Sequence, residues 1–313
     1  MSALTPGETL RGTDAADGRD ALFSASAAAD SAPTPGGERI VTANEGATTI
    51  APTTEIPVQR WKRGESITTT DRVAEEVPVA LIYHGTPHVV MLATPADLED
   101  YAIGFTLSEG YVANADEIRS VEVVQGDETL EVRIGIAWER YTALLRRRRN
   151  LNGRTGCGLC GAETIEDAIR EFEPTTAQGP TVTVEDLHAA IIQLDGLQPL
   201  NSQTGSVHAA AWVLPGEGIQ LVREDVGRHN ALDKTLGALV RAKADFNAGY
   251  LLITSRASYE MVQKAATMGI GFVAALSAPT AFAVRLAVSS GITLVGFARR
   301  DQHVVYANPE RLP

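Results

Sequence analysis

The only two cysteines of the chain, Cys157 and Cys160, stand in one CxxC motif. A secreted domain held together by disulfides would carry more cysteines spread along its length, so this usage favours metal binding or thiol chemistry in a reducing compartment. A CxxC pair supports three chemistries. A thiolate can exchange with a disulfide, two thiolates can hold half of a zinc site, and one thiolate can accept a sulfane sulfur and carry it as a persulfide.

The surroundings of the pair favour the third chemistry. Gly153–Gly161 contains four glycines, which predicts a mobile, exposed loop that we place at residues 146–163. A thioredoxin-like motif belongs at a helix N-terminus after a strand, and a zinc site needs two further ligands that no second CxxC motif supplies. A carrier cysteine must meet a donor and then an acceptor, which a mobile loop permits. We predict no permanently bound metal.

Polar and basic residues follow three consecutive predicted strands in the C-terminal half. The strands are expected at 250–254, 272–276 and 293–297, with helices at 258–268 and 277–291 between them. This order predicts a parallel sheet with right-handed crossovers, and open α/β sheets bind ligands beyond the carboxyl ends of their strands. Hydroxyls, helix N-termini and arginines hold phosphate groups, so we expect a nucleotide-bearing anion there. Ordinary helix caps and solvated charges remain the alternative. The candidate residues at these ends are Ser255, Arg256, Ser277, Phe297, Ala298, Arg299 and Arg300.

Two further sites carry titratable side chains. Asp225 and His229 could transfer protons and Arg228 could pair with an anion, although a charged helix start explains the same residues. His208 lies in an apolar predicted strand, where a lone histidine is more often a satisfied core residue than a ligand.

The remaining sequence divides the chain into parts. Residues 1–52 are rich in Ala, Ser, Thr, Gly, Pro and Asp, which predicts a disordered tail. Residues 53–145 are expected to form a smaller N-terminal α+β portion, in which Thr94 caps a helix that ends at Gly110. Residues 164–313 are expected to form the C-terminal α/β domain, with a mixed, partly parallel sheet. Further elements are predicted as strands at 79–83, 89–92, 121–124 and 130–136, a hairpin of 207–213 and 219–222, and a helix at 230–242.

Charge and hydropathy exclude several classes of protein. The formal net charge is −12, with 39 acidic and 27 basic residues, which argues against bulk affinity for nucleic acid or an anionic membrane. No run of residues is long and apolar enough for a membrane span, and the N-terminus lacks the pattern of a secretory signal. We therefore expect a cytoplasmic protein.

Seven ordered motifs resemble one known family, the FdhD-type formate dehydrogenase accessory sulfurtransferases. The resemblance covers about residues 56–313. The motifs are TPADLEDYAIGFTLSEG (94–110), GRTGCGLCG (153–161), GSVHAA (205–210), REDVGRHNALDK (223–234), SRASYEMVQKA (255–265), SAPT (277–280) and LVGFAR (294–299).

The resemblance implies a function. Members take sulfur from a cysteine desulfurase onto the CxxC pair and deliver it to the molybdenum or tungsten bis-(molybdopterin guanine dinucleotide) cofactor of formate dehydrogenase. Cys157 matches the persulfide carrier and Cys160 its partner. The family's cofactor-binding stretch matches Phe297 to Gln302, although Arg300-Asp301-Gln302 departs from the usual pattern.

The resemblance also implies a homodimer and a C-terminal domain of cytidine-deaminase-like, three-layer α/β/α fold. Deaminase activity itself is not expected, because His208 is not followed by the required glutamate. Two other functions remain open. The chain could be a non-catalytic chaperone of the cofactor that uses CxxC as a redox or metal clip, or a structural zinc protein.

Overall fold

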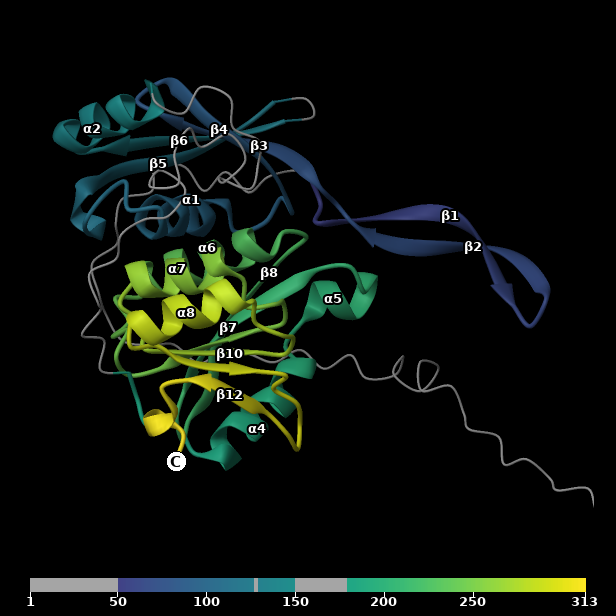
Figure 1. The fold of residues 1–313 in the computed structure, drawn as a ribbon. Coiled ribbons are helices and arrows are strands. Elements are labelled where there is room, and N and C mark those ends of the chain that lie inside the picture. The colour runs from purple at the N-terminus through teal and green to yellow at the C-terminus, as the bar shows by residue number, and fades with distance from the viewer. Residues whose placement is uncertain (1–49, 127–128, 150–178) are drawn as a thin grey trace, which may run out of the picture. The chain divides into compact units, whose positions relative to one another are not determined.

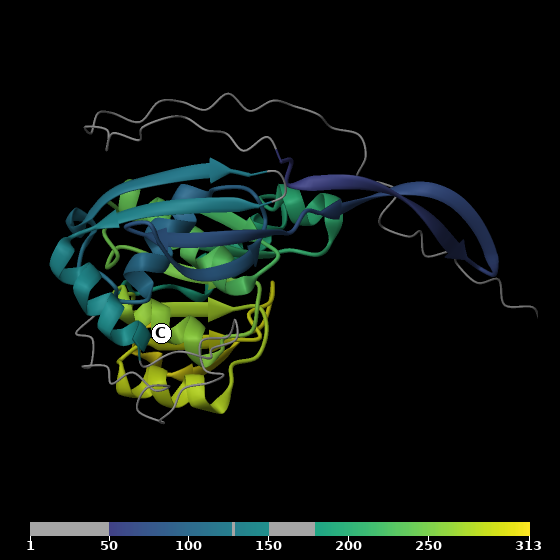
Figure 2. The same cartoon turned by 90° about the horizontal axis from the view of Figure 1, so that it is seen from above.

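The computed structural model describes residues 50–126, 129–149 and 179–313. These residues form three β-sheets and the helices that pack on them (Figure 1). The first sheet is a hairpin of β1 (Thr53–Lys62) and β2 (Glu65–Ala74), which pair antiparallel over their full length. Its far end lies away from the other two sheets (Figures 1 and 2). Large apolar side chains such as Trp61 and Ile67 are therefore exposed on it.

A four-stranded sheet of order β4-β3-β6-β5 forms the N-terminal α+β portion. Strands β3 and β6 run parallel and the other neighbours antiparallel. Alternate residues of β6 are buried, as the two-residue period of a strand requires when one face is covered by a helix. Helix α1 packs on that face, where Tyr101 joins Leu81 and Val132 in the core. The elements are β3 (Val77–Tyr83), β4 (Thr86–Ala93), α1 (Leu98–Ser108), η1 (Ala115–Glu117), β5 (Ile118–Gln125), β6 (Leu130–Ile136) and α2 (Trp138–Arg149).

A six-stranded sheet of order β12-β11-β10-β9-β7-β8 organises the C-terminal half. Strands β9, β10 and β11 are parallel, as predicted, and β7, β8 and β12 are antiparallel to their neighbours. The elements are α4 (Val184–Asp195), α5 (Pro199–Thr204), β7 (His208–Leu214), β8 (Gly218–Asp225), α6 (Arg228–Arg241), β9 (Tyr250–Ile253), α7 (Tyr259–Thr267), β10 (Phe272–Ala275), α8 (Ala281–Ser289), β11 (Thr293–Gly296), β12 (Val304–Ala307) and η2 (Pro309–Arg311).

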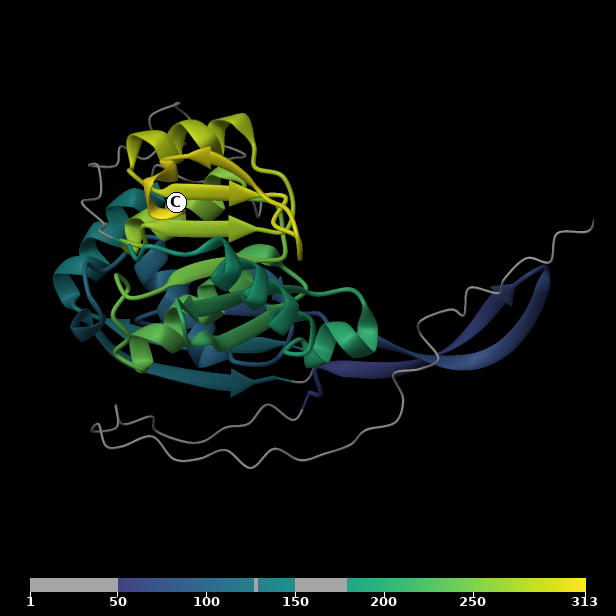
Figure 3. The ribbon, with the colours of Figure 1, turned by 90° about the horizontal axis from the view of Figure 1, so that it is seen from below.

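Helices cover both faces of this sheet (Figures 1 and 3). Trp212 of β7 points into the core with α6, α7 and α8, whereas the next residue, Val213, packs with α4 on the opposite face. The predicted mixed α/β architecture is confirmed. The likeness to cytidine deaminases stays a prediction.

Helices α1 and α6 join the two larger sheets, and two glycines let them touch. A Cβ atom on Gly104 would lie 1.8 Å from the backbone oxygen of Asp233, and one on Gly237 would lie 1.8 Å from that of Asp100. Only glycine permits this separation, because any side chain would overlap the facing backbone. The crossing thus brings charged residues of the two halves together.

The predicted cap of α1 is wrong. The helix begins at Leu98, and its N-cap is Asp97, which has a φ of 53° and makes no side-chain cap hydrogen bond. Thr94 instead contacts the C-terminal half: its backbone N–H donates to Asp225 Oδ2 (3.0 Å), and its hydroxyl accepts from Val226 N–H (3.2 Å). Local sequence cannot reveal partners more than a hundred residues away, so the capping pattern misled the prediction.

Most other predicted strands and helices are present with small shifts at their ends. Helix α8 starts after its N-cap Thr280 rather than at Ser277. The hairpin β1–β2 and the elements α2, α4, α5 and β12 were not predicted. Helix α2 reaches Arg149, into the segment assigned to the loop. The rest of that loop and residues 1–49 of the predicted tail lie outside the described residues. Within the described ranges, no helix is long and apolar enough to cross a membrane.

Candidate functional site at the edge of the six-stranded sheet

The CxxC pair, Cys157 and Cys160, lies outside the described residues. The structure therefore bears on the second part of the predicted site, the edge of the six-stranded sheet where its parallel strands end.

Strand register brings the predicted residues to one edge. Parallel β9, β10 and β11 all end there, and antiparallel β7 begins beside the end of β9 (Figure 3). His208 is the register partner of Asp225, the last residue of β8. Backbone hydrogen bonds continue past the strands, from Thr254 N–H to Ala209 O (3.0 Å) and from Phe297 N–H to Ser277 O (3.1 Å). Segments distant in sequence thus meet at this edge, whereas ligand binding by them stays a prediction.

The segment after β11 forms a tight turn. Phe297 has a φ of 49° and is 41% exposed, whereas Ala298 is buried. The backbone N–H of Arg299 donates to the carbonyl of Gln302 (2.7 Å). The side chains of Arg299, Arg300, Asp301 and Gln302 are exposed. Arg300 pairs with Asp195 of α4. The exposed side chains at this turn are therefore accessible to a ligand.

The other strand ends differ in exposure. Arg256 is exposed, whereas Ser255 is buried and donates its hydroxyl proton to the carbonyl of Arg256 (3.1 Å). Ser277 and His208 are half-buried. Burial lowers the pKa of His208, and the nearby Arg228 guanidinium lowers it further. Both effects favour the neutral imidazole of His208.

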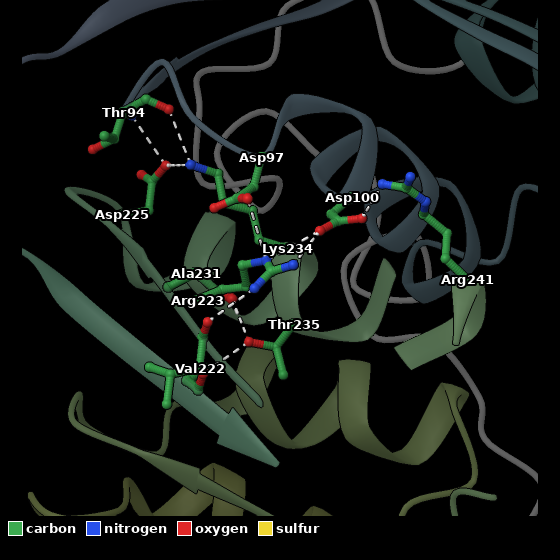
Figure 4. A network of polar contacts seen from close by, with 11 residues as sticks. Thr94, Asp97, Asp100, Val222, Arg223, Asp225, Ala231, Lys234, Thr235 and Arg241 are labelled. Carbon is green, nitrogen blue, oxygen red and sulfur yellow. Dashed lines mark hydrogen bonds and ion pairs between the residues drawn. The ribbon is translucent and has the colours of Figure 1, made fainter. Parts of the chain in front are cut away.

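Asp225 has a positioning role inside the protein. It is fully buried, and its Oδ2 accepts from Lys234 Nζ (2.6 Å) as well as from Thr94 N–H (Figure 4). Its Oδ1 accepts from Gly227 N–H (2.7 Å) and Asn230 Nδ2 (3.0 Å). Both oxygens are thus engaged by protein donors, so Asp225 holds the start of α6 and the turn before α1 in place rather than facing a ligand directly.

Arg228 and His229 occupy the first turn of α6. Burial, together with the charges of Arg228 and Lys264, lowers the pKa of His229 from 6.5 to about 4. The His229 Nε2 atom lies 3.9 Å from Glu260 Oε2 of α7. Among the described residues, neither Arg228 Nε nor His229 Nε2 has a hydrogen-bond partner, although both atoms are buried.

The lowered pKa of His229 predicts a pH effect on stability. An unfolded histidine titrates near 6.5, so acidification protonates the unfolded chain before the folded one, and stability is lost as the pH falls from 6.5 toward 4. Between pH 7 and pH 5 this loss amounts to about 2 kcal/mol. Between pH 7 and pH 5 we expect the His229→Gln variant to lose about 2 kcal/mol less stability than the wild type. Urea unfolding of both proteins at both pH values measures this.

The quantity to measure is the difference between the wild type and His229→Gln in the free energy of unfolding lost on acidification. Burial raises the pKa of Asp233 to about 6 despite its pairing with Lys264, so that carboxyl stabilises the folded state as the pH falls below 6 and opposes His229. If the wild type and His229→Gln lost the same stability between pH 7 and pH 5, His229 would not be held neutral in the folded protein.

Two charged clusters at the α1–α6 crossing were not predicted. Asp100 is buried and accepts from Arg223 Nε and Nη2 (3.0 and 2.9 Å) and from Arg241 Nη1 (2.8 Å) (Figure 4). Lys264 Nζ lies 2.9 Å from both carboxylate oxygens of Asp233. Asp233 of α6 and Lys264 of α7 are 31 residues apart, so no local spacing in the sequence indicated their pairing.

The described histidines offer no complete metal site. His84 and His88 have the HxxxH spacing of some zinc ligands, but the His84 ring hydrogen-bonds the backbone of Ile136 and His88 Nε2 lies 2.9 Å from the Tyr111 hydroxyl. Across the described ranges, no group of three or more His, Cys, Asp and Glu side chains could hold a metal ion.

Comparison with known proteins places this geometry in a family. A sequence model of the FdhD/NarQ family matches residues 74–313. The chain belongs to the FdhD/NarQ family. Two curated relatives are each named sulfur carrier protein FdhD. The protein from Cupriavidus necator is 53% identical over 255 residues, which cover 82% of this chain and 88% of the relative. That from Xanthomonas euvesicatoria pv. vesicatoria is 52% identical over 82% of this chain and 90% of its own length.

A solved structure shares the fold. It comes from Desulfotalea psychrophila, is described provisionally as a formate dehydrogenase accessory protein, and matches with a TM-score of 0.65 at 24% identity. The match covers 83% of this chain and 99% of that one. The FdhD/NarQ region includes every residue of the candidate site, whereas nearly all of the β1–β2 hairpin precedes it.

Proposed function

We propose that this chain is a sulfurtransferase. It accepts sulfur from a cysteine desulfurase as a persulfide on Cys157, with Cys160 as the partner thiol. It then transfers the sulfur to bis-(molybdopterin guanine dinucleotide), carrying molybdenum or tungsten, before this cofactor enters formate dehydrogenase. The protein acts as a homodimer in the cytoplasm, where both cysteines stay reduced.

One observation carries the proposal: the relatives that are 53% and 52% identical are named sulfur carriers, and this chain has a single cysteine pair with which to carry sulfur. The first step follows from thiol chemistry. The Cys157 thiolate attacks the terminal sulfur of the donor persulfide, a new S–S bond forms on Cys157, and the donor cysteine leaves as a thiolate.

The edge of the six-stranded sheet is the proposed place for the cofactor. Its arginines and hydroxyls suit the pyrophosphate of a guanine dinucleotide. Arg228 Nε, which is buried without a hydrogen-bond partner among the described residues, supports this placement. Asp225 is buried and holds the start of α6 in position next to this surface. Asp301 carries the exposed carboxylate of the turn after β11. The contact residues would be His208, Arg228, His229, Ser255, Arg256, Ser277, Phe297, Ala298, Arg299, Arg300, Asp301 and Gln302.

The test is a sulfur-transfer assay on the reduced full-length protein. We expect incubation with a cysteine desulfurase and labelled cysteine to add sulfur to the peptide that contains Cys157, seen by mass spectrometry and removed by reductant. Cys157→Ala should reduce the label to background. Cys160→Ala is the matched control, because it removes a thiol from the same loop while leaving the proposed carrier.

The opposite results separate the alternatives. Unlabelled wild-type protein that still binds the cofactor, together with a Cys157→Ala variant that still supports formate dehydrogenase, would identify a chaperone. Stoichiometric zinc in protein purified under reducing conditions would identify a structural zinc site.

A further inference from the structure

Two histidines from distant parts of the chain share a hydrogen bond next to the turn after β11. His188 Nε2 in α4 lies 3.1 Å from His303 Nδ1 in the segment that leads from this turn into β12, and the two residues are 115 positions apart. Their ring centroids are 5.3 Å apart and their ring planes make an angle of 67°. This centroid separation means that the two nitrogens point at each other, as an N–H···N hydrogen bond requires. One imidazole therefore donates and the other accepts.

The head-on geometry of the rings distinguishes a hydrogen bond from a shared metal ion. Two imidazoles that bind one ion direct both nitrogen lone pairs at a point to the side of the line between the nitrogens. The rings of His188 and His303 instead face each other along that line. A hydrogen bond is the interaction that this arrangement permits.

The histidine pair and an ion pair both connect α4 to the turn. Arg300 pairs with Asp195 at the end of α4, and the side chains of these two residues are 68% and 53% exposed. Water therefore screens their attraction. His188 and His303 are half-buried, so the histidine pair is the better shielded of the two connections.

The hydrogen bond depends on the protonation of the pair. It forms when both rings are neutral or when one is protonated, because an imidazole nitrogen without a proton remains to accept. When both rings are protonated, every ring nitrogen is a donor and two positive charges face each other. Burial lowers the pKa of His303, and His188 lowers it further. The doubly protonated pair is therefore reached only in acid, where the hydrogen bond is lost.

The other charged residues of these elements do not account for this effect. Helix α4 and the turn carry Glu185, Asp186, Asp195, Arg299, Arg300 and Asp301, and β12 carries no charged residue. Among the described residues, His188 is the only side chain whose charge contributes to the shift at His303. The titration is thus a property of the pair.

We infer that His188 and His303 form a latch that holds the turn after β11 against α4 at neutral pH and releases it in acid. Both are positioning residues, because they act on the turn rather than on a reacting atom. The consequence for the cofactor rests on the proposed function, since the same turn belongs to the proposed cofactor surface. The latch itself is tested without sulfur or cofactor, so the two proposals can fail separately.

The test is NMR spectroscopy of the full-length protein from pH 7 to pH 4.5, which follows the histidine rings and the exchange of backbone amides. The Arg299 N–H reports on the turn because it donates to the Gln302 carbonyl. We expect its protection against exchange to fall about tenfold as the latch opens, the change that the loss of one hydrogen bond produces. The amides of β10 should stay protected, which separates release of the turn from unfolding of the whole protein.

Two variants test the origin of the pH effect. His188→Gln removes the facing charge, so it should raise the pKa of His303 toward the ordinary 6.5 and abolish the pH dependence of Arg299 protection. Asp195→Asn removes the second connection to α4, so the loss of protection in acid should become larger than in the wild type.

His88→Gln is the matched control. His88 is also half-buried, but its Nε2 lies 2.9 Å from the hydroxyl of Tyr111 rather than from a second histidine. This variant should leave the His303 titration and the Arg299 protection unchanged. Equal losses of Arg299 protection in the wild type and His188→Gln would overturn the latch, as would protection in the wild type that does not change with pH. A His303 ring that titrates at the same pH in both proteins would overturn it too.

Discussion

Gly104→Ala is expected to destabilise the folded protein by at least about 3 kcal/mol, because the new methyl group overlaps the backbone of α6. The nearest atom is the Asp233 carbonyl oxygen, 1.8 Å from the ideal Cβ position. A backbone atom cannot rotate away as a side chain can, so relief requires α1 and α6 to separate. That movement would also disturb the ion pairs of Asp100 and Asp233. Urea unfolding followed by circular dichroism measures the effect.

Gly196→Ala is the control for this prediction. Gly196 ends α4 with a φ of −86°, and the nearest atom to its Cβ position is the Gln193 oxygen at an ordinary 3.8 Å. Its stability should stay within about 1 kcal/mol of the wild type. The reciprocal variant, Gly237→Ala, should resemble Gly104→Ala. Similar stabilities for Gly104→Ala and Gly196→Ala would show that the helices are not in contact at this point.

Lys234→Met is expected to cost about 3–5 kcal/mol, because it leaves the Asp225 carboxylate buried without its cation. Both side chains are fully buried, with Lys234 Nζ 2.6 Å from Asp225 Oδ2 and 3.0 Å from the Thr94 carbonyl. Methionine keeps most of the volume, so the loss reports on charge rather than on packing. Unfolding in urea again gives the free energy.

A second substitution tests the pairing itself. Asp225→Asn combined with Lys234→Met removes the unpaired charge, so the double variant should be more stable than Lys234→Met alone. Arg133→Met provides a control for an exposed pair, since Arg133 and Glu131 are 52% and 40% exposed and such pairs contribute no more than about 1 kcal/mol. Equal losses for Lys234→Met and Arg133→Met would contradict the prediction.

Local sequence patterns were sufficient to predict the parallel strands of the sheet that carries the candidate site. Short runs of buried residues bounded by glycine and cap residues predicted β9, β10 and β11 and the helices between them, because strand period and turn chemistry are encoded within about ten residues. The shared edge followed from parallel order alone. Element ends were less certain: the serine at 277 precedes α8, whose cap is Thr280.

Local sequence patterns could not predict contacts between residues far apart in the chain. Thr94 has the sequence context of a helix cap, but its partners are Asp225 and Val226. Likewise Asp225 was expected to contact a ligand or transfer protons, whereas the folded chain surrounds it with four donors. A carboxylate looks the same in sequence whether water, a ligand or a buried lysine faces it.

The amino-acid sequence by itself determined the family, the CxxC chemistry to be tested and the α/β class, because these depend on residue types at short spacings. Only the tertiary structure decided how the α1–α6 crossing joins the halves and which carboxylates of the described residues are paired and buried. The physical reason is that burial and pairing arise from residues distant along the chain. Asp233 and Lys264, or Gly104 and Gly237, acquire their roles only once two helices have met.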